Sequence, residues 1–362
     1  MIKTKLVTLI SSFCVILATC CFVVHTTHII ENVSCNIGVM AAKTVFSNGD
    51  FPTPIQSSSP SSENGGDTSA SLNDPESNRS DENDNEPNSQ ERDTESIEER
   101  ERHKNERTYK IIESQCKSGG EKYGDFCVKN ATGHNIDIAA KLKERPYFDL
   151  EKNSPPQILI LHTHTTESYM KKNLGFFYES SPTRSKDSNC SVVGVGECIS
   201  KELLSGGYNV IHDRTFHDSP SYNGSYGRAA NTIKRNLQEN PIKVVLDIHR
   251  DSMGSKETGK IKPTFTQNGE KAAQIMILVG TSFPNSSENI VFALNLQEKL
   301  EHLFPGITRP MYLCDATYNM NITNGSLLIE VGTEVNTAKE AFRSGELLGK
   351  ALVELFDTIS SG

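Results

Sequence analysis

The sequence predicts an α/β domain with a mostly parallel sheet flanked by helices on both faces, and three observations support this prediction. Short strand-like runs alternate with helical patterns over the region 108–362. The strand-like runs are continuously apolar, as strands buried on both faces are. Polar residues follow several of these runs, where the strands of such a sheet end and where ligands usually bind.

The sequence of residues 1–30 predicts a short cytoplasmic tip and a transmembrane anchor. Leu6–Val24 is a run of nineteen residues without a charge, which is long enough to cross a bilayer as a helix. Lys3 and Lys5 precede the run, so the N-terminus is expected in the cytoplasm and the remaining chain outside. A cleaved signal peptide is the alternative, but no clean small-residue cleavage site follows the run.

The composition of residues 31–107 predicts a disordered acidic linker. Ser47–Arg107 contains sixteen acidic and six basic residues among Ser, Asn, Pro and Gly, with too few apolar residues to bury a core. This segment accounts for the whole-chain net charge of −9, so the acidity says nothing about the ligand of the folded part. The chain has no basic face or recognised nucleic-acid motif, so we expect no nucleic-acid partner.

The strands are expected where β-prone residues form short apolar runs bounded by polar or turn residues. In chain order, these runs are Ile158–Leu161, Tyr208–His212, Lys243–His249, Gln274–Gly280 and Ser326–Gly332.

The helices are expected where apolar residues recur every three or four positions. They are Val192–Leu204, Tyr226–Leu237, Asn289–Leu303 and Lys339–Ile359. In the first helix the spacing is carried by Val192, Val195, Ile199 and Leu203.

A metal-ligating pattern follows the first strand, where His162 and His164 precede Glu167. In an extended segment, residues two apart point the same way, so the two histidines are expected to share a face. Imidazole and carboxylate groups are ligands that zinc uses in catalytic sites with an open position. A polar loop after a buried strand is the competing interpretation.

Polar residues at three further strand ends favour the metal site. Asp213 follows the second strand, Asp247-Ile-His249-Arg250-Asp251 closes the third, and Glu330 lies near the end of the strand Ser326–Gly332. Such residues are costly in apolar strands unless they are paired or bound to a metal. Several of them at one edge of a sheet indicate a common site.

With these residues, the chain resembles the stage II sporulation protein P family of membrane-anchored peptidoglycan hydrolases over about Phe126–Phe342. More distantly it is similar to zinc-dependent N-acetylmuramoyl-L-alanine amidases. Arg228-Ala-Ala-Asn231 resembles a shortened form of their Arg-x-x-x-Ala-Asn stretch. Two departures stand out: Thr317 occupies a position where arginine is expected, and Val192-Val193 stands where the amidases carry a zinc-binding glutamate. The family matches are Val128–Gly133, His162–Tyr169, Val195-Gly196, His212–Asp218, Ser221–Tyr226, Asp247–Asp251, and Leu328–Gly332 with Asn336.

The resemblance implies an amidase-like fold and Zn²⁺ held by His162 or His164, by Glu167 and by His249. The strand-end position favours His162 and the amidase alignment favours His164; we narrowly prefer His162, and Glu167 replaces the missing third ligand. Glu330 is the implied general base. Asp247 and Asp251 are expected to orient the histidines, with an Arg250–Asp251 ion pair as the alternative. Arg228, and the turn Tyr222–Tyr226, are expected either to contact substrate or only to cap a helix.

The implied function is hydrolysis of the bond between muramic acid and L-alanine in peptidoglycan during sporulation and engulfment, with cleavage of peptide cross-links as a further activity. The implied partners are stage II sporulation protein D and a septal membrane protein, with the hydrolase domain outside the cytoplasm at the septal, forespore-engulfing membrane. A non-catalytic wall-binding module and another metal hydrolase, such as a deacetylase, are the alternatives. Cys116 and Cys127 are candidates for a disulfide, although separate thiols are favoured.

Overall fold

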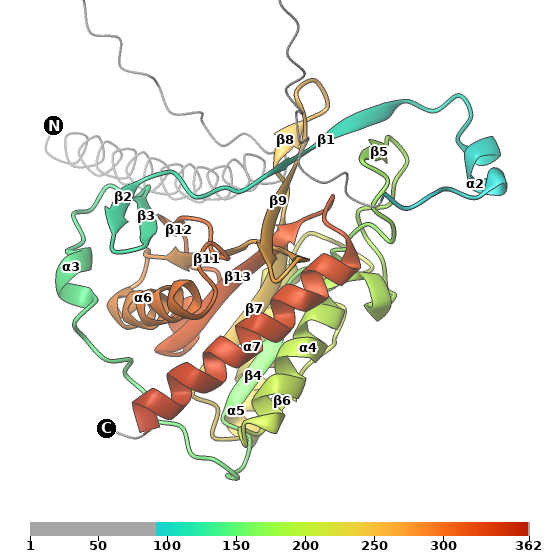
Figure 1. The fold of residues 1–362 in the computed structure, drawn as a ribbon. Helices are drawn as coiled ribbons and strands as arrows, with labels where there is room; N and C mark the ends of the chain where they lie inside the picture. Colours follow the sequence, from blue (N-terminus) through green and yellow to red (C-terminus); the bar gives the residue numbers. More distant parts are fainter. Residues whose placement is uncertain (1–91, 361–362) are drawn as a thin grey trace, which may run out of the picture.

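The computed structural model describes residues 92–360, which form two sheets and the helices that cover them (Figure 1). The helices are α2 (Ile97–Arg102), α3 (Ile138–Lys141), α4 (Val192–Ser205), α5 (Ser225–Glu239), α6 (Ser286–Leu303) and α7 (Ala338–Ser360), with 3-10 turns η1 (Ser188–Cys190) and η2 (Met320–Ile322). The strands are β1 (Thr108–Ser114), β2 (Glu121–Tyr123), β3 (Phe126–Asn130), β4 (Ile158–Leu161), β5 (Phe176–Tyr178), β6 (Val210–His212), β7 (Val244–Asp251), β8 (Gly254–Ser255), β9 (Gly259–Gln267), β10 (Glu270–Ala273), β11 (Ile275–Gly280), β12 (Met311–Cys314) and β13 (Gly325–Thr333). All the predicted strands and helices are therefore present, with ends shifted by a few residues.

The main sheet has the strand order β2-β3-β12-β11-β13-β7-β4-β6 and is mixed, which corrects the mostly parallel sheet predicted above. Strands β6, β4, β7 and β13 are parallel to one another. Strand β11 is antiparallel to β13, and β12 and β3 share the direction of β11. The reason is the connection between β7 and β11, which runs through strands β8, β9 and β10 and not through a crossover helix. Only a crossover returns a chain to a sheet in the parallel direction.

Helices cover both faces of the main sheet, as predicted (Figure 1). Along β4, Ile158 and Ile160 face the large core that contains apolar residues of α4, α6 and α7. Leu159 and Leu161 face the opposite way, toward Ala229 and Ile233 of α5. A continuously apolar strand therefore marks burial on both faces, because alternate side chains point to opposite sides.

The second sheet has the order β10-β9-β1-β5, with β8 paired to β9. The segment 92–107 leads into it and corrects the extent of the predicted disordered linker. It contains α2, the backbone N–H of Asp93 donates to the Asn173 carbonyl, and Lys172 Nζ lies 2.7 Å from Glu99 Oε2. The charges that suggested disorder are thus partly used in capping and ion pairing. The rest of the linker, 31–91, lies outside the described residues.

Within residues 92–360, no helix combines the length and apolar character needed to cross a membrane. The anchor predicted at 6–24 lies outside the described residues and stays a prediction. Cys116 and Cys127 are both free thiols, in agreement with the favoured interpretation.

Candidate metal centre

Three neighbouring parallel strands bring the candidate residues together. In the register between β7 and β13, His249 lies directly opposite Glu330, and both strands run the same way as β4. The chain leaves β4 after Leu161 and turns at residues 163–166, which carries His164 and Glu167 over the end of β7. The carboxyl ends of β4, β7 and β13 thus form one site, as the sheet rule predicts.

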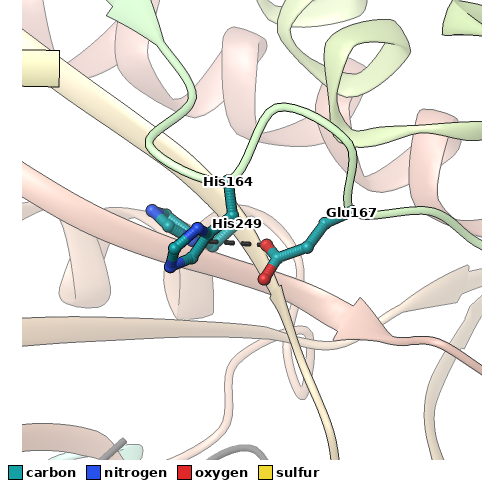
Figure 2. Close-up of side chains that lie close together, drawn as sticks. All are labelled: His164, Glu167 and His249. Atoms are coloured by element: carbon teal, nitrogen blue, oxygen red, sulfur yellow. Dashed lines mark ion pairs between the residues drawn. The ribbon is translucent and has the colours of Figure 1, made fainter. Parts of the chain in front are cut away.

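His164, Glu167 and His249 form a buried cluster with the composition of a metal site. Each offers one ligand atom, and these atoms lie within 4.8 Å of one another. Figure 2 shows the three side chains close together, with a dashed line for the ion pair in which His249 Nδ1 lies 3.3 Å from Glu167 Oε2. Two imidazoles and one carboxylate, with a further position open, match the donor set of catalytic zinc sites.

Asp247 orients His249 from the side away from Glu167. His249 Nε2 lies 3.0 Å from Asp247 Oδ1. The carboxylate of Asp247 also accepts hydrogen bonds from the backbone N–H of Thr163, at 2.8 Å, and from its hydroxyl, at 2.6 Å. Asp247 therefore turns Nδ1 of His249 toward the cluster and ties the following turn to β7. A carboxylate behind a ligating imidazole is the arrangement usual in metal sites.

Charge in the cluster is concentrated on the two carboxylates. Burial opposes their ionisation, but the adjoining His249 outweighs it, so the pKa of Asp247 falls to about 2 and the pKa of Glu167 lies well below its usual range. In turn, Asp247 and Glu167 outweigh the burial of His249 and hold its pKa well above the ordinary value. His249 thus lies between two buried carboxylates, of which only Glu167 belongs to the ligand cluster.

Glu330 faces the cluster across a cavity of about 280 Å³ that His164, Glu167 and His249 also line. Its Oε2 is buried and has no hydrogen-bond partner among the described residues. Burial, with the nearby charge of Asp251, raises the pKa of Glu330 to about 8. A carboxylate with an unsatisfied oxygen and a raised pKa, beside a metal-ligand set, has the properties of a general base.

His162, the ligand preferred from the sequence, lies outside the cluster, which contains His164 instead. Its Nε2 is 2.9 Å from His212 Nε2, and its Nδ1 is 2.9 Å from the carbonyl oxygen of Ile248. Its Nε2 faces α4, where a Cβ on Gly196 would come within 2.9 Å of this nitrogen. The shared-face argument required an extended segment, but the chain turns directly after His162, so the two histidines separate.

Asp213 and Arg228 also lie outside the cavity lining. Asp213 follows the edge strand β6 and pairs with Arg235 of α5 at 3.1 Å. Arg228 donates hydrogen bonds to the carbonyl oxygens of His217, Ser221 and Asn223. Arg228 therefore braces the loop before α5, whereas Tyr222 and Tyr226 of the same stretch line the cavity.

Asp251 does not orient a histidine, and it does not pair with the side chain of Arg250. Its Oδ2 lies 2.8 Å from Arg309 Nη2, and its Oδ1 accepts from the backbone N–H of Ser252. Arg309 lies just before β12, far away in the sequence, so no local pattern indicated this partner. Arg250 and Asp251 both line the cavity.

Other cavity residues come from segments that sequence reasoning did not single out. Arg184, Lys260 and Glu334 line it from three separate parts of the chain. Tyr222, predicted to contact substrate or to cap a helix, stacks on His164 with ring centroids 4.5 Å apart. The guanidinium of Arg184 lies 5.0 Å from the centre of the Tyr222 ring. The strand-end rule could not find Arg184 or Lys260, because only the fold brings their segments to the cavity. Glu334 directly follows β13 and satisfies that rule.

The chain is similar to proteins of one known family. The family model for Stage II sporulation protein P matches residues 37–353. The stage II sporulation protein P of Bacillus subtilis (strain 168) is 27% identical over 240 residues, which span 61% of this chain and 58% of the relative. The match thus covers less than two thirds of that relative.

Two solved structures show a more distant similarity. The CwlD amidase of Clostridioides difficile, in complex with the GerS lipoprotein, is 16% identical and covers 57% of this chain and 98% of its own, with a TM-score of 0.37. The catalytic domain of CwlV, an N-acetylmuramoyl-L-alanine amidase from Bacillus (Paenibacillus) polymyxa var. colistinus, is 15% identical and covers 56% and 98%, with a TM-score of 0.34. Similarities of this size carry no inference about activity.

Proposed function

The chain belongs to the stage II sporulation protein P family, and from that premise we propose that it is a zinc-dependent peptidoglycan hydrolase that cleaves the amide bond between N-acetylmuramic acid and L-alanine. The observation that carries the proposal is the cluster of His164, Glu167 and His249 facing Glu330 across one cavity. This set contains what amide hydrolysis requires: a place for a metal, room for water and a base.

The three ligand residues would hold the zinc ion, and Asp247 would keep His249 in its binding orientation. When bound, zinc supplies Lewis acidity toward an amide carbonyl and acidifies water at neutral pH. The ordered turn at 163–166, tied to Asp247 through Thr163, holds His164 and Glu167 in place before substrate arrives. Such pre-organisation lowers the cost of reaching the transition state.

Glu330 would take a proton from the attacking water and deliver it to the departing amine. Its position opposite His249 in the sheet register places it beside the ligand cluster, and its Oε2 is not committed to any described residue. A raised pKa suits both halves of this task, because the same group must first accept a proton and then release it near neutral pH.

The test combines metal content with product analysis. Glu330→Gln should keep zinc but lose about 10²–10⁴-fold in rate, since an amide cannot accept the proton. Mass spectrometry of digested cell wall should show glycan strands freed of peptide and new amino groups. Glu346→Gln on α7 is the matched control: this side chain lies outside the cavity lining, and the variant should hydrolyse normally.

New reducing ends without new amines would make the protein a glycosidase and refute the proposal. Zinc loss in Glu330→Gln would instead make Glu330 a ligand. Acetate release would favour the deacetylase alternative, and absence of any product, with binding to cell wall, would favour the non-catalytic module. Cleavage of peptide cross-links would add an endopeptidase activity to the amidase.

We further propose that residues 6–24 anchor the protein as a single-pass membrane protein, with the hydrolase domain outside the cytoplasm at the septal membrane. The uncharged run and the lysines before it support this orientation. Stage II sporulation protein D and a septal membrane protein are the proposed partners. Protease added to intact protoplasts should degrade the domain; protection of the domain would contradict the orientation.

A further inference from the structure

Two of the three cationic side chains that line the cavity have a carboxylate partner. Arg184 Nη1 lies 2.6 Å from Asp218, and Lys260 Nζ lies 2.8 Å from Glu334. Arg250 is different: among residues 92–360 it has no carboxylate oxygen within 4.0 Å of its side-chain nitrogens. The cavity therefore carries one guanidinium whose charge is not neutralised by a direct partner.

Backbone groups hold this guanidinium in place without neutralising it. Arg250 Nη2 donates to the carbonyl oxygen of Thr183 at 2.9 Å, and Nη1 donates to that of Asp251 at 3.4 Å. The Nε atom is buried and makes no hydrogen bond within the described part of the chain. The carboxylates of Glu167, Glu334 and Glu330 attract this guanidinium from beyond ion-pair distance. Because its Nε–H has no acceptor in residues 92–360, the fixed guanidinium is suited to an incoming anion that can accept hydrogen bonds.

The position of Arg250 ties the anion to the ligand cluster. Arg250 follows His249 directly, and its backbone N–H donates to Glu167 Oε2 at 3.2 Å. The other two cations that line the cavity, Arg184 and Lys260, are already paired with Asp218 and Glu334 and attract an incoming anion less strongly. An acidic ligand is therefore directed to the guanidinium, close to the bond that the cluster would attack.

We propose that Arg250 binds a free carboxylate of the substrate's peptide, so that the enzyme selects acidic stem peptides over amidated ones. The inference rests on the proposed function and names the substrate feature that the site recognises. Arginine suits this role because its planar guanidinium can donate two parallel hydrogen bonds to one carboxylate. In a stem that begins with L-alanine and D-glutamate, the α-carboxylate of the glutamate is the nearest such group to the scissile amide.

Binding to a hydrolysis-deficient protein tests the proposal without requiring turnover. Calorimetry on zinc-loaded Glu330→Gln would compare N-acetylmuramoyl-L-alanyl-D-glutamate γ-methylamide with the same compound amidated at the α-carboxylate, so that the two ligands differ only in the α-carboxylate. We expect the acid to bind about 10- to 100-fold more tightly, as hydrogen bonds to a charged partner do. Adding Arg250→Gln should remove this preference while zinc content stays normal. Arg343→Gln on α7, whose ion pairs are with Glu270 and Glu346, is the matched control.

Equal affinity for the acid and the amide in the parent protein would overturn the proposal, as would a preference that survives Arg250→Gln. The parent comparison decides the matter even if the Arg250 variant does not fold. A different result would refute only the proposed function. In that case the wild-type protein would leave the muramoyl–alanine bond intact, but the Glu330→Gln protein would still bind the acid more tightly than the amide, and Arg250→Gln would remove this preference.

Discussion

Replacement of Asp247 by asparagine tests how the fold prepares the ligand cluster. The buried carboxylate lies 3.0 Å from His249 Nε2 and accepts two hydrogen bonds from Thr163, one from its backbone and one from its hydroxyl. Asparagine has nearly the same shape but carries no charge. The substitution therefore removes the electrostatic support of His249 while leaving most of the packing in place.

The expected magnitude follows from these contacts. Losing a hydrogen-bonded carboxylate behind a ligating imidazole costs about 10- to 100-fold in metal affinity, or about 1.4–2.8 kcal/mol. The effect should not exceed this range, because the introduced asparagine keeps an oxygen beside His249 Nε2 while Glu167 and His164 remain. We therefore expect weakened zinc binding with a folded protein.

Competition against a colorimetric chelator would measure the zinc dissociation constant, and chemical denaturation would measure the stability of the metal-free protein. Thr163→Val is the matched control, since it removes the hydroxyl donor to Asp247 but keeps the charge. It should cost about 1 kcal/mol in stability and leave zinc affinity near the wild-type value. Wild-type affinity in Asp247→Asn, or an equal loss in Thr163→Val, would refute the reasoning.

Further predictions concern the two histidines, acid stability and the linker. His164→Ala should lose zinc while His162→Ala retains it; equal retention by both variants would remove the His-Thr-His motif from the metal site. Burial and the neighbouring His162 lower the pKa of His212 to about 2, so the folded protein resists a proton that the unfolded chain binds below about pH 6.5. Unfolding free energy should thus fall as pH drops from about 6.5 toward 4, and His212→Asn should make this slope shallower by about one proton; an unchanged slope would contradict the assignment. Deleting residues 57–91 should leave hydrolysis of isolated cell wall intact but impair function in cells, and reduced activity of the purified variant would instead make the segment part of the fold or of substrate binding.

Local patterns in the sequence were sufficient for the elements nearest the site. The run Ile158–Leu161 becomes β4, because a strand buried on both faces is apolar at every position. The helical spacing of residues 192–204 becomes α4, because a helix buried along one stripe is apolar every three or four positions. The strand-end rule likewise brought His249, Glu330 and Glu167 to one place. The rule holds here because the strands that carry these residues, β4, β7 and β13, are parallel to one another.

Sheet direction depended on tertiary structure. Strand β11 was predicted correctly as an element, yet its antiparallel pairing with β13 depends on the long excursion through β8, β9 and β10. Nothing within Ile275–Gly280 records which way the chain re-enters the sheet, since pairing direction is set by the connection and by the neighbouring strands.

The sequence alone determined that a histidine, a glutamate and a strand-end His249 would meet, but the choice between His162 and His164 was made by the fold. Residues two apart share a face only while the backbone is extended, and the chain turns immediately after His162. His162 contacts His212, which is 50 positions away in the sequence, and Asp251 pairs with Arg309, which is 58 positions away. Such partners leave no periodic trace, because their proximity arises only when the whole sheet and its loops have assembled.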